Sequence, residues 1–233
     1  GGLGAGGGIV SYFNSWLSAT PDSRIAIEGN TITGNTSEVS GGGIGVITTA
    51  DPNPPSDTQV PLPPPAFAAA DVEITGNLIA NNDLTGFGAA VTVAYSDVFG
   101  HPDGEYSTRV PDRTGVNGNI SEDPLLDGAG IPAECSPTID AADPGLDFSA
   151  EPAPDGGRAN MGHTGGTTAA TPSLPDLNGD GVVDGIDMLR LSVSFGSTSA
   201  DARYNSSVDV NGDGSVDGDD LALVAPDYGM SCD

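Results

Sequence analysis

Apolar and polar residues alternate with a period of two along two similar stretches of the chain. Residues 25–35 read Ile-Ala-Ile-Glu-Gly-Asn-Thr-Ile-Thr-Gly-Asn, and residues 72–82 read Val-Glu-Ile-Thr-Gly-Asn-Leu-Ile-Ala-Asn-Asn. The two stretches align without a gap at an offset of 47 residues, which matches Asn30 with Asn77. Period two predicts a short β-strand on each side of an asparagine turn.

Glycine-rich strand sequences follow each of these stretches at a similar distance. They occupy residues 43–47 and 89–95, and residues 6–10 look like the same element from an earlier turn. Short repeated strands joined by Asn and Gly corners are typical of a parallel β-solenoid, whose turns stack because none can bury its apolar face alone. An antiparallel sandwich is the alternative, but it predicts hairpin turns between neighbouring strands rather than one unit repeated at a fixed phase.

The first 166 residues resemble secreted right-handed parallel β-helix proteins of the pectate-lyase-like group. The resemblance is carried by the closing section, in residues 95–98, 118–126, 136–144 and 155–162. It implies a mainly β fold, a right-handed parallel β-helix or solenoid. The group includes polysaccharide lyases, but also adhesins and surface proteins, so the resemblance indicates the fold more strongly than an activity.

Two insertions interrupt the predicted coils. Residues 14–23 form a short excursion, and residues 50–66 contain the runs Asp-Pro-Asn-Pro-Pro and Pro-Leu-Pro-Pro-Pro. Proline cannot donate a ladder hydrogen bond, so we expect the second insertion to be an exposed loop. It is either a wall or contact for a ligand or partner, or a loop without such a role.

Two acidic stretches near the end of the chain share one spacing. Residues 176–187, the first loop, and residues 209–220, the second loop, both carry oxygen side chains at positions 1, 3, 5, 9 and 12. Both have glycine at position 6, where the chain must turn sharply, and valine at position 8. This is the spacing of an EF-hand-type calcium loop.

The chemistry of these side chains fits a hard cation. Four carboxylates in one loop repel one another unless a divalent ion lies between them, and oxygen ligands without His or Cys favour calcium over zinc or copper. We therefore predict two Ca²⁺ ions. The predicted ligands, with position 7 contributing its carbonyl, are Asp176, Asn178, Asp180, Val182, Asp184 and Asp187 in the first loop and Asp209, Asn211, Asp213, Ser215, Asp217 and Asp220 in the second.

The paired loops resemble a type I dockerin module over about residues 174–229. In that family a short helix follows each loop, which implies helices over residues 186–191 and 219–224, the second ended by Pro226. The resemblance implies calcium binding and attachment to a cohesin-like protein partner. The loops begin 33 residues apart, a longer spacing than in compact cellulosomal modules, and the hydroxyl pair that many dockerins carry near the end of the loop is absent.

Composition narrows the possible partners. The chain has 233 residues, 33 acidic and 6 basic, with a formal net charge of −27. Nucleic acid is therefore a poor partner, and no apolar run approaches the roughly 20 residues that cross a bilayer. Aromatic residues make up only 5%, which favours a stacked solenoid over a conventional core.

The two cysteines suit an extracellular, oxidising compartment, which we predict as the location of this secreted or cell-surface chain. Cys135 and Cys232 either form a bridge that ties the end of the chain to the preceding domain or remain separate thiols. No signal peptide is visible and the chain begins without Met, so we expect a piece of a longer precursor.

No convincing catalytic constellation emerges, and we predict no catalytic and no cofactor-binding residue other than the calcium ligands. Lyases of the β-helix group use a basic residue beside an acidic cluster. The nearest match is a pair of arginines close to several acidic residues and a histidine: Arg109 and Arg113 near Asp97, His101, Asp103 and Glu105. Surface ion pairs explain that cluster as well. Trp16, with its aromatic neighbours, is a thin basis for a carbohydrate-binding module.

These patterns together predict a β-helix domain over residues 1–166, a linker over residues 167–175 and a calcium module over residues 176–229. We expect a secreted or cell-surface structural or assembly protein, a rod whose dockerin-like module attaches it to a cohesin-like partner or a neighbouring subunit. Head-to-tail stacking into filaments is one form of this. The alternative is the C-terminal fragment of a secreted polysaccharide lyase or glycoside hydrolase, anchored through its dockerin.

Overall fold

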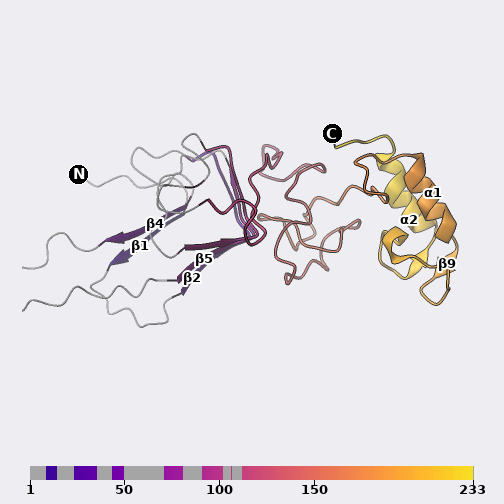
Figure 1. Cartoon of the computed structure of the whole chain (residues 1–233), viewed down its shortest axis with the longest axis horizontal. Coiled ribbons are helices and arrows are strands. Elements are labelled where there is room, and N and C mark those ends of the chain that lie inside the picture. The colour runs from indigo at the N-terminus through magenta and orange to yellow at the C-terminus, as the bar shows by residue number, and fades with distance from the viewer. Residues whose placement is uncertain are drawn as a thin grey trace, which may run out of the picture. The chain divides into compact units, whose positions relative to one another are not determined.

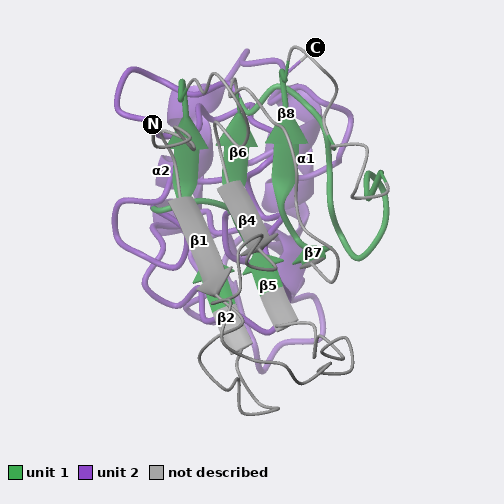
Figure 2. Ribbon diagram, turned by 90° about the vertical axis from the view of Figure 1, so that its left-hand side faces the viewer, with its two compact units in different colours: residues 1–124, 161–163 green, residues 125–160, 164–233 purple. Residues whose placement is uncertain are grey.

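We describe the protein from a computed structural model. Two compact units make up the chain, residues 1–124 with 161–163 and residues 125–160 with 164–233 (Figure 2). The domain limits predicted from the sequence stay a prediction. The structure describes residues 9–14, 24–35, 44–49, 71–80, 91–101, 106 and 112–232.

Unit 1 is built from short strands that pair in parallel (Figure 1). Three small sheets form, in the orders β1-β4, β2-β5-β7 and β3-β6-β8. The strands are β1 (Ile9–Asn14), β2 (Arg24–Glu28), β3 (Thr31–Thr33), β4 (Ile44–Thr49), β5 (Asp71–Thr75), β6 (Leu78–Ala80), β7 (Val91–Ala94) and β8 (Asp97–Phe99).

The register of these sheets agrees with the alignment read from the sequence. Arg24 pairs with Asp71 and Thr31 with Leu78, which is the offset of 47 residues in both sheets. Ile9 pairs with Ile44, so two of the three glycine-rich stretches are neighbours as predicted. The third does not follow the prediction, because β7 pairs with β5 and not with β4. Strands far apart in sequence therefore lie side by side and in phase.

Period-two alternation explains which residues form the core of unit 1. Ile27, Ile74 and Val93 lie on the buried face of their strands, while Ala26 and Thr92 are exposed. Burial removes apolar area from water at roughly 25 cal/mol per Å² and so stabilises the stack of strands.

A ladder of polar side chains stabilises the corner between these sheets. Asn77 Oδ1 accepts a hydrogen bond from Asn30 N at 2.9 Å, and Asn77 Nδ2 donates to Ile27 O at 2.7 Å. The ladder continues because Asn77 N donates to Ser96 Oγ, and Ser96 N donates to Asn119 Oδ1. The predicted corner role of Asn30 and Asn77 is thus confirmed.

Unit 2 begins with a stretch of turns and ends with two short helices. Its elements are α1 (Gly185–Ser194), β9 (Ser197–Thr198), the 3₁₀ helix η1 (Ser206–Val208), β10 (Ser215–Val216), α2 (Gly218–Val224) and the 3₁₀ helix η2 (Ala225–Asp227). Both helices occur where the sequence predicted them. Pro226 lies in η2, directly after the end of α2.

The helical part of unit 2 has its own apolar core. Val183 and Val216, at position 8 of the two loops, are fully buried together with Leu191 and Val224 from α1 and α2 and with Val208 from η1. Each loop therefore places one valine against both helices, which explains why a β-branched residue suits that position.

A disulfide joins Cys135 to Cys232 within unit 2. Of the two alternatives read from the sequence, the bridge is therefore the one present. Within the predicted linker, Thr171 Oγ1 donates to Pro132 O and Ser173 Oγ donates to Asp140 Oδ2. This stretch is thus hydrogen-bonded to the turns that precede it.

Some sequence predictions fall on residues outside the described ranges. Both insertions are of this kind, since residues 15–23 and 50–70 are not described. Across the described residues, no helix has the length and apolar character needed to cross a membrane.

Candidate metal centre

The carboxylate at position 9 of each loop also caps the helix that follows. Asp184 is the N-cap of α1 and accepts a hydrogen bond from Ile186 N at 2.7 Å. Asp217 is the N-cap of α2 and accepts from Asp219 N at 2.9 Å. An N-cap aspartate accepts a hydrogen bond from an otherwise unpaired N–H of the first helical turn. The same side chain therefore belongs to the loop and stabilises the start of the helix.

The carboxylate at position 12 completes a capping box. Asp187 Oδ2 accepts from Asp184 N at 2.7 Å, and Asp187 Oδ1 accepts from Asn178 N at 3.0 Å. Asp220 repeats both bonds, from Asp217 N at 2.7 Å and from Asn211 N at 3.3 Å. Both side chains are fully buried. Each therefore ties the start of its loop to the first turn of its helix.

Position 1 differs between the two loops. Both oxygens of Asp176 accept backbone N–H groups, among them those of Gly181 and Gly179 at 2.7 Å. Burial alone would raise the pKa of Asp176, but these hydrogen bonds outweigh it and lower the pKa.

Asp209, at position 1 of the second loop, is more buried than its counterpart. Its Oδ2 accepts from Gly214 N at 2.8 Å and from Tyr204 Oη at 2.6 Å, and this bond to Asp209 raises the pKa of Tyr204. Asp209 Oδ1 is buried without any hydrogen-bond partner. A buried carboxylate oxygen is costly to leave unpaired, and a bound cation would satisfy it.

Each loop is completed by main chain from the other half of the module. β10, at the end of the second loop, pairs antiparallel with β9, which follows α1. The first loop pairs in the same way with residues 229–232, which we call the tail: Val183 N donates to Met230 O at 2.9 Å, and Cys232 N donates to Gly181 O at 3.1 Å. The module is thus built from two interlocked halves whose loops begin 33 residues apart; α1 and α2 are shown in Figure 1.

The residues present fit calcium. All predicted side-chain ligands would bind the metal through oxygen. Asp209 Oδ1 in addition is a buried oxygen that accepts no hydrogen bond. Within the described residues, however, no three His, Cys, Asp or Glu groups lie together so as to hold a metal ion as they stand. Many of the carboxylate oxygens are engaged by backbone N–H groups, so the twelve-ligand assignment stays a prediction.

Sequence reasoning missed the role of Tyr204 and of the tail. Tyr204 lies five residues before the second loop, and nothing in the sequence signals its bond to Asp209. The tail had one usable signal, because Gly229 follows Gly196 at the same spacing of 33 residues that separates the loops. Both glycines have a positive φ and both donate to the valine at position 8 of a loop.

The weak catalytic cluster is only partly within the described residues. His101 is buried, and its Nε2 lies 3.1 Å from Ile79 O, while Asp97 Oδ1 accepts from Glu122 N. These groups therefore have structural contacts. Arg109 lies outside the described ranges.

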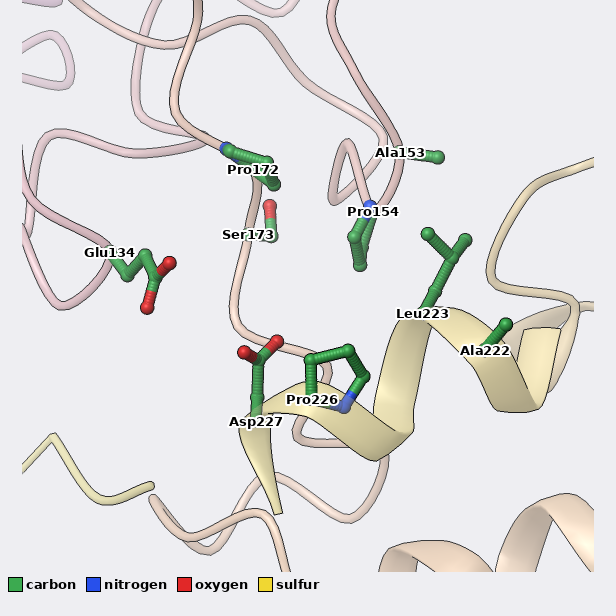
Figure 3. A pocket seen from close by; sticks show the side chains of 9 residues that line it. All are labelled: Glu134, Ala153, Pro154, Pro172, Ser173, Ala222, Leu223, Pro226 and Asp227. Atoms are coloured by element: carbon green, nitrogen blue, oxygen red, sulfur yellow. The ribbon is translucent and has the colours of Figure 1, made fainter. Parts of the chain in front are cut away.

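A pocket opens in unit 2 beside α2 and η2 (Figure 3). Pro154, Pro172, Leu223 and Pro226 form apolar walls around it. The carboxylates of Glu134 and Asp227 lie on the side away from Leu223 (Figure 3). None of the lining residues is basic, so the pocket gathers no acid–base pair of the kind a lyase needs.

Comparison with known families identifies the last part of the chain. Residues 174–226 match the model of the dockerin type I domain. No curated protein matches the chain. No solved structure matches it either. The match covers both loops and both helices, so a dockerin type I domain is present in unit 2.

Proposed function

We propose that this chain is a calcium-binding component of a secreted or cell-surface assembly, attached to a cohesin-type protein partner through its dockerin domain. The observation that carries the proposal is the duplicated loop–helix unit within the dockerin match, with seven hydrogen bonds that correspond between the two halves. Two calcium ions, one in each loop, would hold the helices in place.

An apolar stripe on α1 supports attachment through that helix. Ile186, Leu189 and Val193 lie on one face at helical spacing and are 50%, 62% and 69% exposed. An exposed cluster of large apolar side chains marks an interaction surface more often than a solvated one. Ile186 also stands where many dockerins carry a hydroxyl residue, which favours a partner with an apolar contact face.

The second half offers no equivalent stripe. At the spacing of 33 residues, Asp219, Ala222 and Pro226 occupy the matching positions. The backbone is therefore duplicated, but the surface is not. Apart from Arg190 and Arg203 every charged residue of the domain is an aspartate, so the partner should be neutral or basic around an apolar centre.

Binding to a panel of type I cohesin domains, with and without calcium, tests this proposal. Leu189→Asp should abolish calcium-dependent binding, whereas Ala222→Asp, the matched change on α2, should leave it within about twofold, as for a residue at the rim of an interface. Equal loss in both variants would contradict attachment through α1. Binding that is unchanged by a chelator would contradict the role of calcium.

We also propose that residues 1–166 form a right-handed parallel β-helix. The in-phase parallel sheets and the ladder of Asn30, Asn77, Ser96 and Asn119 support it, because stacked coils repeat the same corner residue. In this proposal residues 167–175 link the rod to the dockerin.

End-to-end packing of such rods is a further element of the proposal. β2 and β3 lie at the edges of their sheets within the described residues, and strand edges favour pairing with another chain. Electron microscopy of the purified protein with calcium should then show elongated particles. Uniform single copies at all concentrations would exclude polymerisation without affecting attachment through the dockerin.

A further inference from the structure

The tail sets the backbone of the first loop at the residue predicted to supply a carbonyl ligand. Gly181 O and Val183 N are both hydrogen-bonded to the tail, through Cys232 N and Met230 O. Neighbouring residues of an extended strand point to opposite sides. The backbone N–H and carbonyl of Val182, which lies between them, therefore face the interior of the loop. The N–H donates to Asp180 Oδ1 at 3.1 Å.

The two loops differ in how their partner strand is held. β9, the partner strand of the second loop, lies within the chain, after α1 and before Tyr204 in sequence, and its residue Ser197 is buried. The tail follows η2, and its residues Ser231 and Cys232 are exposed. At its far end the tail is held by the disulfide to Cys135, 97 residues away in sequence.

The equivalent position in the second half carries no cysteine. Ser199 occupies the place of Cys232 at the spacing of 33 residues, and Ser199 N donates to Gly214 O at 2.7 Å as Cys232 N donates to Gly181 O. The same backbone contact is thus made twice, once with a covalent bond to a distant segment and once without.

We propose that the Cys135–Cys232 disulfide is a positioning element of the first calcium loop, so that calcium affinity depends on the disulfide at the first loop and not at the second. Without the bridge, the exposed tail loses its covalent anchor and separates from the first loop more readily, so the contacts that orient the backbone of Val182 are weakened. A reducing dithiol brings this about by passing two electrons to the bridge, which yields two cysteine thiols while the dithiol closes to its own disulfide.

The inference rests on the proposed calcium binding, and its test separates the two loops. Asp213→Ala disables the second loop and Asp180→Ala, at the same position, disables the first. Calcium titration calorimetry is performed on both full-length variants, oxidised and after dithiol reduction. Reduction should weaken calcium binding about 10-fold or more in Asp213→Ala, the range seen when residues supporting metal ligands are lost, and less than about twofold in Asp180→Ala.

Three controls keep the result interpretable. Replacing both cysteines by serine should reproduce the effect of reduction, and a dithiol should then have no further effect. The unmutated chain should show one weakened and one unchanged site on reduction, which removes any dependence on the loop variants being folded. By linkage, calcium should protect the disulfide from reduction in Asp213→Ala but not in Asp180→Ala.

Each outcome has a distinct meaning. An equal change in both loops, or none in the first loop, overturns the inference while leaving calcium binding intact. Absence of calcium binding in the oxidised chain overturns the proposed function and this inference with it.

Discussion

At the scale of single residues, the two loops differ most at position 1. Asp176 has both oxygens engaged by backbone N–H groups, whereas Asp209 keeps Oδ1 buried without a partner and receives Tyr204 on Oδ2. A free, buried carboxylate oxygen is predisposed to a cation because binding relieves an unmet hydrogen-bonding need. The hydroxyl of Tyr204, which donates to Oδ2, would then orient this predicted calcium ligand.

Tyr204→Phe should therefore weaken calcium binding at the second loop. Loss of a group that orients a metal ligand lowers affinity by about 10-fold or more, and the first loop should keep its affinity. Calorimetric titration of the two sites measures this. Tyr228→Phe, at a 60% exposed position, is the matched control; a similar loss there would show that the effect is not specific to the bond with Asp209.

Asp140 should make stability depend on pH. Burial raises its pKa to about 6, against the lowering effect of the bond from Ser173 and with smaller raising contributions from Glu151 and Asp155. Between the unfolded pKa of 3.8 and about 6 the folded chain binds more protons than the unfolded chain. The contribution of Asp140 to the free energy of unfolding therefore falls as pH rises through that window.

Asp140→Asn tests this dependence. Asparagine stays neutral and tolerates the positive φ of 53° at this position, so the variant should lose part of the decline in stability between about pH 4 and pH 6. Urea unfolding of the calcium-saturated chain at a series of pH values measures it. An unaltered slope in Asp140→Asn would refute the assignment.

At the scale of elements, the corner ladder holds the parallel strands in register. Asn77 is fully buried and bonds to Asn30 in one direction and to Ser96 in the other. Its side chain also satisfies the carbonyl of Ile27. One side chain therefore serves several backbone groups that have no water nearby.

Asn77→Ala should lower the free energy of unfolding of unit 1 by at least about 2 kcal/mol, because it leaves buried donors and acceptors unpaired. Chemical denaturation followed by circular dichroism measures the change. Asn35→Ala removes a corner asparagine whose amide bonds to Thr33 O in an exposed setting, so its effect should stay within about 0.5 kcal/mol. Similar losses in both variants would argue against a special role of the ladder.

The β1–β4, β2–β5 and β3–β6 strand pairs and both helices could be predicted from the sequence because local periodicity and the loop spacing determine them. The extension of the ladder to Ser96 and Asn119 could not be predicted, because the later paired strands follow at a shorter spacing in the sequence. Val72 pairs with Val91, an offset of 19 rather than 47 residues. A serine also replaces the asparagine there, so neither spacing nor residue type repeats.

At the scale of the whole molecule, helix formation and the predicted cation binding use the same side chains. Asp184 and Asp187 cap α1, and Asp217 and Asp220 cap α2, while all four are predicted calcium ligands. The part of the candidate site that the sequence could predict was the set of oxygen-bearing side chains in the two loops. Whether Cys135 and Cys232 are bonded, and how the two halves exchange strands, depends on long-range contacts, for which the spacing of Gly196 and Gly229 was the one signal found in the sequence.

Removing calcium should therefore unfold the dockerin domain and leave the parallel sheets in place. Chelation should reduce the helical signal in far-ultraviolet circular dichroism, and added calcium should restore it, because metal binding and folding are coupled in such sites. Retention of the helical signal and of the melting temperature in excess chelator would contradict this expectation.

The strand exchange between β9 and β10, and between the tail and the first loop, has one more consequence. Neither half of the module contains both a loop and the strand that pairs with it. A peptide spanning only residues 174–200 therefore lacks the tail, which pairs with the first loop. A backbone nick between β9 and η1 should leave the fragments intertwined rather than release them. Transplanting a single loop into another scaffold should fail for the same reason, and the smallest portable unit is the interleaved pair.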